Sequence, residues 1–171
     1  MLEYQKQNCE LTLREGLQCY YESFPESKEI LKDSPESGYL LRDHDCTHVI
    51  FGLDISIDQE AILDTWVLWG TSFKWKYLLG YANLPQIKDL QKRLMAELGI
   101  KGFLGLYWNT LSIKRKVFFR TRKMKKKWPF QIPEEYLDMK ISDLREVHGI
   151  NILSAEELNY IPTKWSGSIS N

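Results

Sequence analysis

Residues 44–63 read HDCTHVIFGLDISIDQEAIL, and the predicted fold is built outward from this stretch. His44 and His48 are four residues apart, about one helical turn, and Asp45 lies three residues before His48. All three side chains therefore share one face of a predicted helix. Imidazole and carboxylate groups on one face are donors that zinc, iron(II) and manganese accept in proteins, so the stretch predicts a metal site.

The sequence on both sides of Gly52 predicts a helix hairpin. A first helix, with a serine N-cap and a proline at its start, is expected over residues 34–51 and ends at Gly52. The sequence SIDQ at 56–59 has the form of a capping box, and the apolar pattern after it extends a second helix to about residue 81. Glu60 falls in the first turn of this second helix, so the hairpin brings its carboxylate back toward the two histidines.

Helical patterns cover the rest of the chain as well. Strand signals are weak, because apolar and polar residues alternate poorly and no Asn-Gly or Asp-Gly turn occurs. We therefore predict an all-α, single-domain helical bundle over residues 1–161, with a frayed tail over 162–171. Its other helices are expected within 1–24, over 85–99, over 101–127 as one helix or as two broken near Gly102 and Gly105, and over 133–147.

Composition limits the class of protein. With 171 residues the chain is long enough for one domain with a real core, and its formal net charge of +0 gives no overall attraction to nucleic acid. Its three cysteines are odd in number and form no Cys-x-x-Cys pair, which is typical of a reducing compartment. The N-terminus is polar and acidic rather than a secretory signal, and no apolar stretch reaches the length of a membrane span. We expect a cytoplasmic protein.

Several interpretations of the four candidate ligands His44, Asp45, His48 and Glu60 remain open. Asp45 is either the fourth ligand or a base directed at metal-bound water. The same residues also suit a solvated helix surface without a metal. The HD phosphohydrolases require a histidine upstream of His44, and this chain has none there. A gluzincin-like hydrolase, with Asp45 in place of the glutamate of His-Glu-x-x-His, is a further alternative.

The motif His44-Asp45-x-x-His48, followed after eleven residues by Glu60, resembles the signature of the Coq-four family of ubiquinone (coenzyme Q) biosynthesis proteins. The glycine that ends the motif helix, and Trp66 after Glu60, are also similar to that family. Near the C-terminus, residues 141–150 (ISDLREVHGI) resemble its closing helix. The likeness is loose over most of the remaining chain.

The resemblance implies an all-helical fold with a metal held by His44, Asp45, His48 and Glu60, with zinc as the favoured ion and iron, manganese or magnesium as the others. It implies an apolar cavity for a prenyl lipid or prenylated quinone precursor, and association with a membrane surface and with other quinone-biosynthesis enzymes. A homodimer is a further expectation. The implied activity is oxidative removal of the ring carboxyl carbon, with Asp45 as a catalytic group, and the alternative is a non-catalytic prenyl-lipid scaffold with a structural metal. The absence of an organellar N-terminal extension favours a bacterial member at the inner face of the membrane.

A basic segment, residues 114–127, contains nine lysine and arginine residues and no acidic one. Aromatic residues lie within and just after it, and the combination is typical of a surface that contacts anionic lipid headgroups. A solvated helix face is the alternative. No nucleic-acid-binding motif accompanies the charges, so no nucleic-acid partner is expected. The residues predicted to contact lipid or membrane are Lys114, Arg115, Lys116, Phe118, Phe119 and Arg120.

Overall fold

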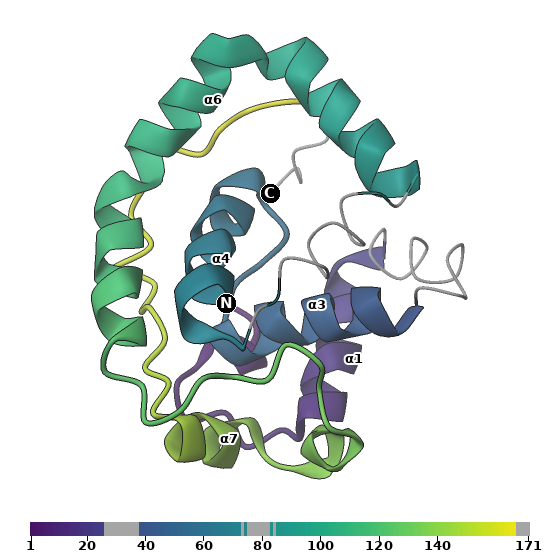
Figure 1. Cartoon of the computed structure of the whole chain (residues 1–171), viewed down its shortest axis with the longest axis vertical. Helices are drawn as coiled ribbons and strands as arrows, with labels where there is room; N and C mark the ends of the chain where they lie inside the picture. Colours follow the sequence, from purple (N-terminus) through teal and green to yellow (C-terminus); the bar gives the residue numbers. More distant parts are fainter. Residues whose placement is uncertain (26–37, 73, 75–82, 84, 167–171) are drawn as a thin grey trace.

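The computed structural model describes residues 1–25, 38–72, 74, 83 and 85–166. Over these residues the chain is mostly helical, with two isolated bridges and no strand, so the predicted all-α class is confirmed there. Figure 1 shows the arrangement of the elements. In chain order they are the 3₁₀ helix η1 (Glu3–Gln5), α1 (Leu13–Ser23), α3 (Gly38–Phe51), α4 (Ile57–Gly70), α6 (Pro85–Thr121), the 3₁₀ helix η3 (Glu134–Asp138) and α7 (Ile141–His148).

The long helix α6 forms an arc along one side of the molecule, and α4 packs against its inner side (Figure 1). Helix α3 contacts α4, α1 and α7, so the α3–α4 hairpin lies at the centre of the fold. The C-terminal segment, residues 150–166, runs back along α6 (Figure 1). Hydrogen bonds join Glu157 of this segment to Arg120 of α6, and Ile161 to Asn109.

Buried apolar side chains hold the α3–α4 hairpin together. Phe51, at the end of α3, stacks on Trp66 of α4, with ring centroids 4.7 Å apart and an interplanar angle of 13°. Both side chains are fully buried. Gly52 ends α3 with a φ of +70°, a left-handed conformation that glycine adopts without strain. The predicted hairpin is therefore present, while the predicted start of its first helix, over 34–37, lies outside the described residues.

Helix α4 begins at the predicted position but without the predicted capping box. Ser56 is the N-cap residue, yet its side chain makes no cap hydrogen bond to any described residue. The Gln59 side chain turns to Asp54 instead. Its amide donates to Asp54 Oδ2 over 2.7 Å, and its oxygen accepts from the Asp54 N–H over 2.9 Å. Gln59 thus stabilises the turn before α4 through Asp54, two residues before the Ser56 partner that the capping box predicts.

The predicted continuation of α4 to about residue 81 is wrong. The helix ends at Gly70, where the backbone leaves the helix to pair with Trp128. Trp128 N–H donates to Gly70 O over 2.9 Å, and Ser72 N–H donates to Trp128 O over 2.8 Å. This pairing connects segments far apart in sequence, so local helical periodicity gives no sign of it. Residues 73 and 75–82 lie outside the described residues.

The two predicted helices after Pro85 are both present, and α6 comprises them on either side of a kink at Gly99. Gly99 interrupts its helical backbone with φ 59° and ψ −177°, at the position where the sequence predicts a stop, but helical turns resume directly after it. The alternative breaks near Gly102 and Gly105 do not occur. The helix ends at Thr121 rather than at residue 127, because the chain leaves it there to bring the following segment back toward α4.

The predicted helix over 133–147 is correct only in its second half. The 3₁₀ helix η3 comes first, and the chain then extends at Met139 and Lys140 before α7 begins. Leu13 N–H donates to Met139 O, and Ile141 N–H donates to Leu11 O, each over 2.9 Å. These bonds join the start of α1 to the start of α7, and they replace the helical bonds that one continuous helix would make.

Residues 162–166, within the predicted frayed tail, make specific contacts. The N–H and hydroxyl of Thr163 donate to the buried carboxylate of Asp58, over 2.7 and 2.9 Å. The N–H and hydroxyl of Ser166 donate to Glu97 over 2.5 and 2.6 Å. These bonds tie the C-terminal segment to α4 and α6, while residues 167–171 lie outside the described residues.

We predict that Gly149→Ala lowers the free energy of unfolding by about 2–3 kcal/mol, because of left-handed strain and a close contact. Gly149 ends α7 at φ +68°, and a Cβ there would lie 2.8 Å from the backbone nitrogen of Lys125. Gly105→Ala is the matched control, since a Cβ there meets no described atom within 4 Å. It is expected to stabilise the helix by up to about 1 kcal/mol. Urea unfolding followed by circular dichroism measures both, and equal effects would contradict the prediction.

Candidate metal centre

Three of the four predicted ligands converge where α3 meets α4. His44 and His48 lie one turn apart on α3, and Glu60 lies in the first turn of α4. One donor atom from each residue lies within 4.8 Å of the other two. The helix hairpin therefore brings together, from two elements, a metal group of His44, His48 and Glu60 that could hold one divalent ion.

His48 is fully buried, yet its ring nitrogens lack the partners that buried polar atoms normally have. Neither Nδ1 nor Nε2 has a hydrogen-bond partner among the described residues. Nε2 lies 3.1 Å from Glu60 Oε1, but the pair does not have hydrogen-bond geometry. Two donors on one tetrahedral ion stand about 3.3 Å apart when each bond is about 2.0–2.1 Å long. Because an unpaired buried nitrogen costs about 1–3 kcal/mol, both observations fit two ligands directed at a common ion.

The charge around the metal group favours a cation. Partial burial raises the pKa of Glu60, but His48 and His44 lower it by more, so this carboxylate is ionised at neutral pH. Burial lowers the pKa of His44, but three nearby carboxylates raise it by more, and its net pKa lies above the usual value. These carboxylates belong to Asp45, Glu60 and Asp64. The Glu60 side chain is 39% exposed, so the metal group is open to solvent on that side.

Asp45, the predicted fourth ligand and catalytic group, lies beside the metal group rather than within it. Its Oδ2 accepts a hydrogen bond from the Tyr21 hydroxyl over 2.8 Å, and its Oδ1 accepts one from the Tyr20 hydroxyl over 3.4 Å. Asp45 Oδ1 is also 3.7 Å from His44 Nδ1, too far for a hydrogen bond but close enough to attract the ring. Outer carboxylates commonly orient metal-bound histidines in this way. Coordination or catalysis by Asp45 itself stays a prediction.

Sequence reasoning missed two tyrosines and one aspartate near the metal group. Tyr20 and Tyr21 belong to α1, far from the motif in sequence, and the Tyr20 ring lies 5.4 Å from the His48 ring between centroids. Asp64 follows Glu60 by one turn of α4. Asp64 is exposed to solvent over part of its surface. Partial desolvation by the surrounding protein atoms and the negative charge of Glu60 nevertheless raise the pKa of Asp64 to about 6. The sequence could have indicated Asp64, because it follows Glu60 by four residues and therefore lies on the same helix face.

The cations of the basic segment differ in their surroundings. Arg115 and Lys116 are exposed on α6, whereas Lys114 is half-buried. Arg120 is also partly buried, and its Nη2 donates to both carboxylate oxygens of Glu157, over 2.9 and 2.8 Å. The sequence does not predict this ion pair, because Glu157 lies 37 residues after Arg120 and the basic segment itself contains no acidic residue. Of these four cations, Arg115 and Lys116 are the two that are exposed.

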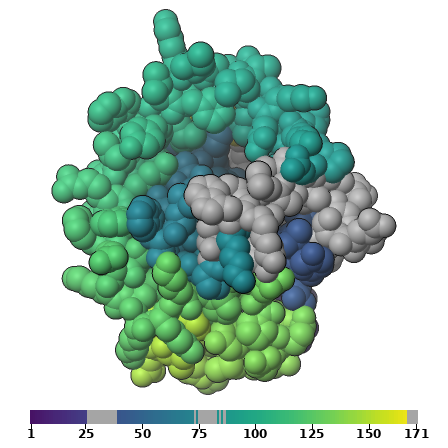
Figure 2. Space-filling view, viewed as in Figure 1, coloured from purple at the N-terminus to yellow at the C-terminus, as the bar shows by residue number. Residues whose placement is uncertain are grey.

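The aromatic residues in and just after the basic segment also include both exposed and buried side chains. Phe118 packs against Trp69 of α4, with ring centroids 5.1 Å apart, and Phe119 is 56% exposed. Trp128 and Phe130 are buried in the core. The side chains of α6 form the upper and left edges of the molecule in Figure 2. Among the described residues, no helix combines the length and apolar character that a membrane span requires.

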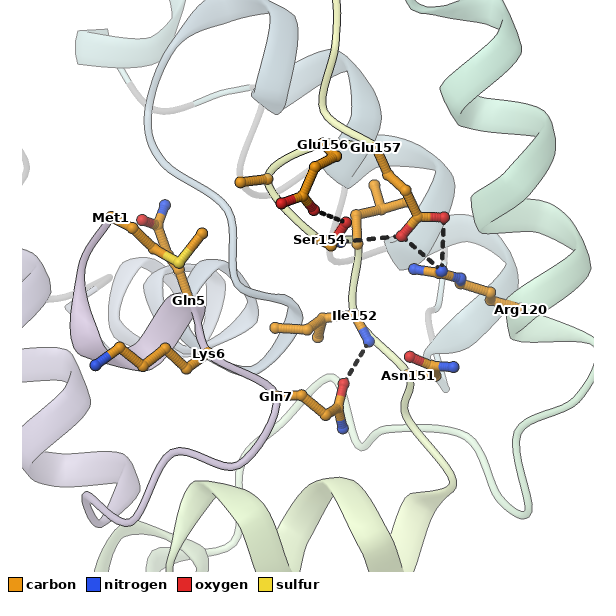
Figure 3. A pocket seen from close by; sticks show the side chains of 12 residues that line it. Met1, Gln5, Lys6, Gln7, Arg120, Asn151, Ile152, Ser154, Glu156 and Glu157 are labelled. Carbon is orange, nitrogen blue, oxygen red and sulfur yellow. Dashed lines mark hydrogen bonds and ion pairs between the residues drawn. The ribbon is translucent and has the colours of Figure 1, made fainter.

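Two open pockets lie away from the metal group. One, of about 320 Å³, lies between the N-terminal residues and residues 151–157, with an arginine–glutamate ion pair in its wall (Figure 3). The other, of about 430 Å³, is lined by residues 54–58 and by side chains from 160 to 165. None of the three candidate ligands lines either pocket. The predicted apolar lipid cavity therefore stays a prediction.

Comparisons of the chain with models of protein families, with curated proteins and with solved structures found no match. The resemblance to the Coq-four family therefore rests on the motif and on residues 141–150. The motif and the geometry of the metal group are the basis for a functional proposal.

Proposed function

We propose that this chain is a divalent-metal protein of ubiquinone-type quinone biosynthesis, which binds a polyprenylated aromatic acid and removes its ring carboxyl carbon oxidatively. The observation that carries the proposal is the convergence of His44, His48 and Glu60 from two helices, in the motif spacing of the Coq-four family. Two histidines and one carboxylate with open positions are also the donor set that non-haem iron(II) enzymes use in oxygen chemistry.

In this proposal each residue of the metal group has a defined part. His44 and His48 project from a helix whose other side is packed in the core, so their positions are fixed before substrate arrives. Glu60 lies on the solvent side, and the substrate approaches there. A bound ion supplies a Lewis acid or, as iron, a centre that reacts with O₂. The ring carboxyl group leaves as CO₂ and a hydroxyl group replaces it, with O₂ as oxidant and a two-electron donor as reductant.

The test uses the metal-loaded full chain and a polyprenylated 4-hydroxybenzoate labelled with ¹³C at its carboxyl carbon. With O₂ and a reductant, the wild type is expected to release labelled CO₂, and Glu60→Gln is expected to lose this activity. Glu146→Gln, a change on the exposed side of α7, is the control and should retain it. Complete retention of the label with iron, manganese and zinc in turn would contradict the proposed reaction.

We also propose that α6 lies against a membrane surface. The support is a set of exposed apolar side chains along this helix, of which Ile100 is 75% exposed, Leu104 56% and Trp108 70%. Each exposed basic residue near an anionic surface adds about 1 kcal/mol to binding. Sedimentation with phosphatidylglycerol vesicles is expected to be stronger than with phosphatidylcholine vesicles, and to weaken in Lys116→Glu. Equal sedimentation with both lipids, or none, would contradict this part of the proposal.

Removal of the metal with EDTA is expected to leave the helices intact, because the hairpin is packed through buried side chains such as Phe51 and Trp66. The far-ultraviolet circular dichroism at 25 °C should not change. The Tm should fall by roughly 10 °C, since a ligand at 100–1,000 times its Kd contributes about 3–4 kcal/mol. A scaffold with a structural metal predicts the opposite, so loss of helical signal on chelation would contradict the catalytic role.

A further inference from the structure

The metal group leaves one side of a bound ion without a described protein donor. Its three residues supply two neutral imidazoles and one carboxylate, so a divalent ion there would keep an excess positive charge. Metal sites with three protein ligands commonly hold water at the remaining position, and a nearby carboxylate orients that water. Besides Glu60 itself, the carboxylates that act on His44 are those of Asp45 and Asp64.

Asp45 is poorly placed for this task. Its two oxygens accept hydrogen bonds from the hydroxyls of Tyr20 and Tyr21, and its contact with the metal group is to Nδ1 of His44. Asp45 is 7% exposed, whereas the open side of the metal group is the side of Glu60. Asp45 therefore supports a ligand from the protein side, and it does not face the solvent side of the ion.

Asp64 is placed on the open side. It follows Glu60 by four residues on α4, so the two carboxylates share one face of the helix. The Asp64 carboxylate interacts electrostatically with all three residues of the metal group, and it accepts no hydrogen bond from any described residue. Lys114 of α6, a half-buried cation, also interacts electrostatically with Asp64.

We propose that Asp64 is a positioning residue of the metal centre, whose carboxylate accepts a hydrogen bond from water bound to the ion on the Glu60 side. Through this water Asp64 offsets the excess charge of the ion and fixes the direction of the open coordination position. This inference rests on the metal centre of the proposed function and adds a residue to it.

The test measures the affinity of the purified full chain for zinc by competition with a chromophoric chelator. Asp64→Asn is expected to weaken zinc binding by about 10–100-fold, the range for residues that act through a ligand. Asp64→Glu should restore most of the affinity. Asp89→Asn, an exposed change on α6, is the matched control and should not alter it. Glu60→Gln should weaken binding more than Asp64→Asn.

A second readout separates positioning from a general effect on the fold. In cobalt-loaded protein, Asp64→Asn should shift the visible d–d bands, while the circular dichroism of the metal-free protein stays that of the wild type. Wild-type affinity together with a wild-type cobalt spectrum in Asp64→Asn would overturn the inference. If Glu60→Gln still loses the metal in that case, the proposed metal centre stands and only the role of Asp64 fails. A wild type that binds no metal would end both.

Discussion

Replacement of His48 by glutamine is expected to remove the metal from the purified, untagged protein. Loss of an outer residue alone costs about 10–100-fold in metal affinity, so loss of a direct ligand should cost at least about 100-fold. Glutamine is close to histidine in size, and the hairpin is packed through other buried side chains such as Phe51 and Trp66, so the helix hairpin should survive. Elemental analysis by mass spectrometry measures the ratio of metal to chain before and after loading with one equivalent of zinc.

His148→Gln is the matched control for this experiment. His148 is also buried, but it lies in α7 against the Lys127 carbonyl and the Tyr136 hydroxyl, away from the metal group. This variant should keep the full metal content even if it is less stable. Full metal content in His48→Gln, or equal loss in both variants, would contradict the assignment of His48 as a ligand.

Replacement of Arg145 by methionine is expected to cause a large loss of stability. Arg145 is fully buried in α7, and its guanidinium group donates to five backbone carbonyls at 2.5–3.3 Å. The carbonyls belong to Tyr4, Lys6, Gln7, Val49 and Ile50. Burial lowers the pKa of Arg145 to about 10, so it is still charged at neutral pH. One side chain thus fastens the N-terminal segment and the end of α3 to α7.

Arg145→Met should lower the free energy of unfolding by at least about 4 kcal/mol, because several buried carbonyls lose a charged donor at once. In urea this corresponds to a shift of the midpoint on the order of 2 M. The control is Arg14→Met, since Arg14 pairs with Asp138 at the surface, where the two side chains are 59% and 72% exposed. Its loss should cost less than about 1 kcal/mol. Similar midpoints for the two variants would contradict the role of Arg145.

The features that the sequence predicts correctly have local causes. Gly52, Gly99 and Gly149 end or interrupt helices at the expected positions, and each has a positive φ. The spacing of His44 and His48 on one helix, with Glu60 just after the turn, needed only helix geometry and the hairpin turn. For these residues the physical cause lies within a few positions of the chain.

The features that were missed depend on contacts between distant segments. The end of α4 at Gly70 follows from pairing with Trp128, and the split of the last predicted helix follows from bonds to the start of α1. The tyrosines that engage Asp45 come from α1, and the partner of Arg120 comes from the C-terminal segment. Periodicity carries no information on these pairs. For the same reason the sequence could not show whether Asp45 lies within the metal group or beside it.

The most direct test of the central claim is anomalous diffraction at the zinc edge from crystals of the zinc-loaded chain. We predict one strong peak within about 2.0–2.2 Å of a nitrogen of His44, a nitrogen of His48 and an oxygen of Glu60. A zinc-loaded crystal with no peak between these side chains, or with its zinc bound elsewhere, would contradict the account.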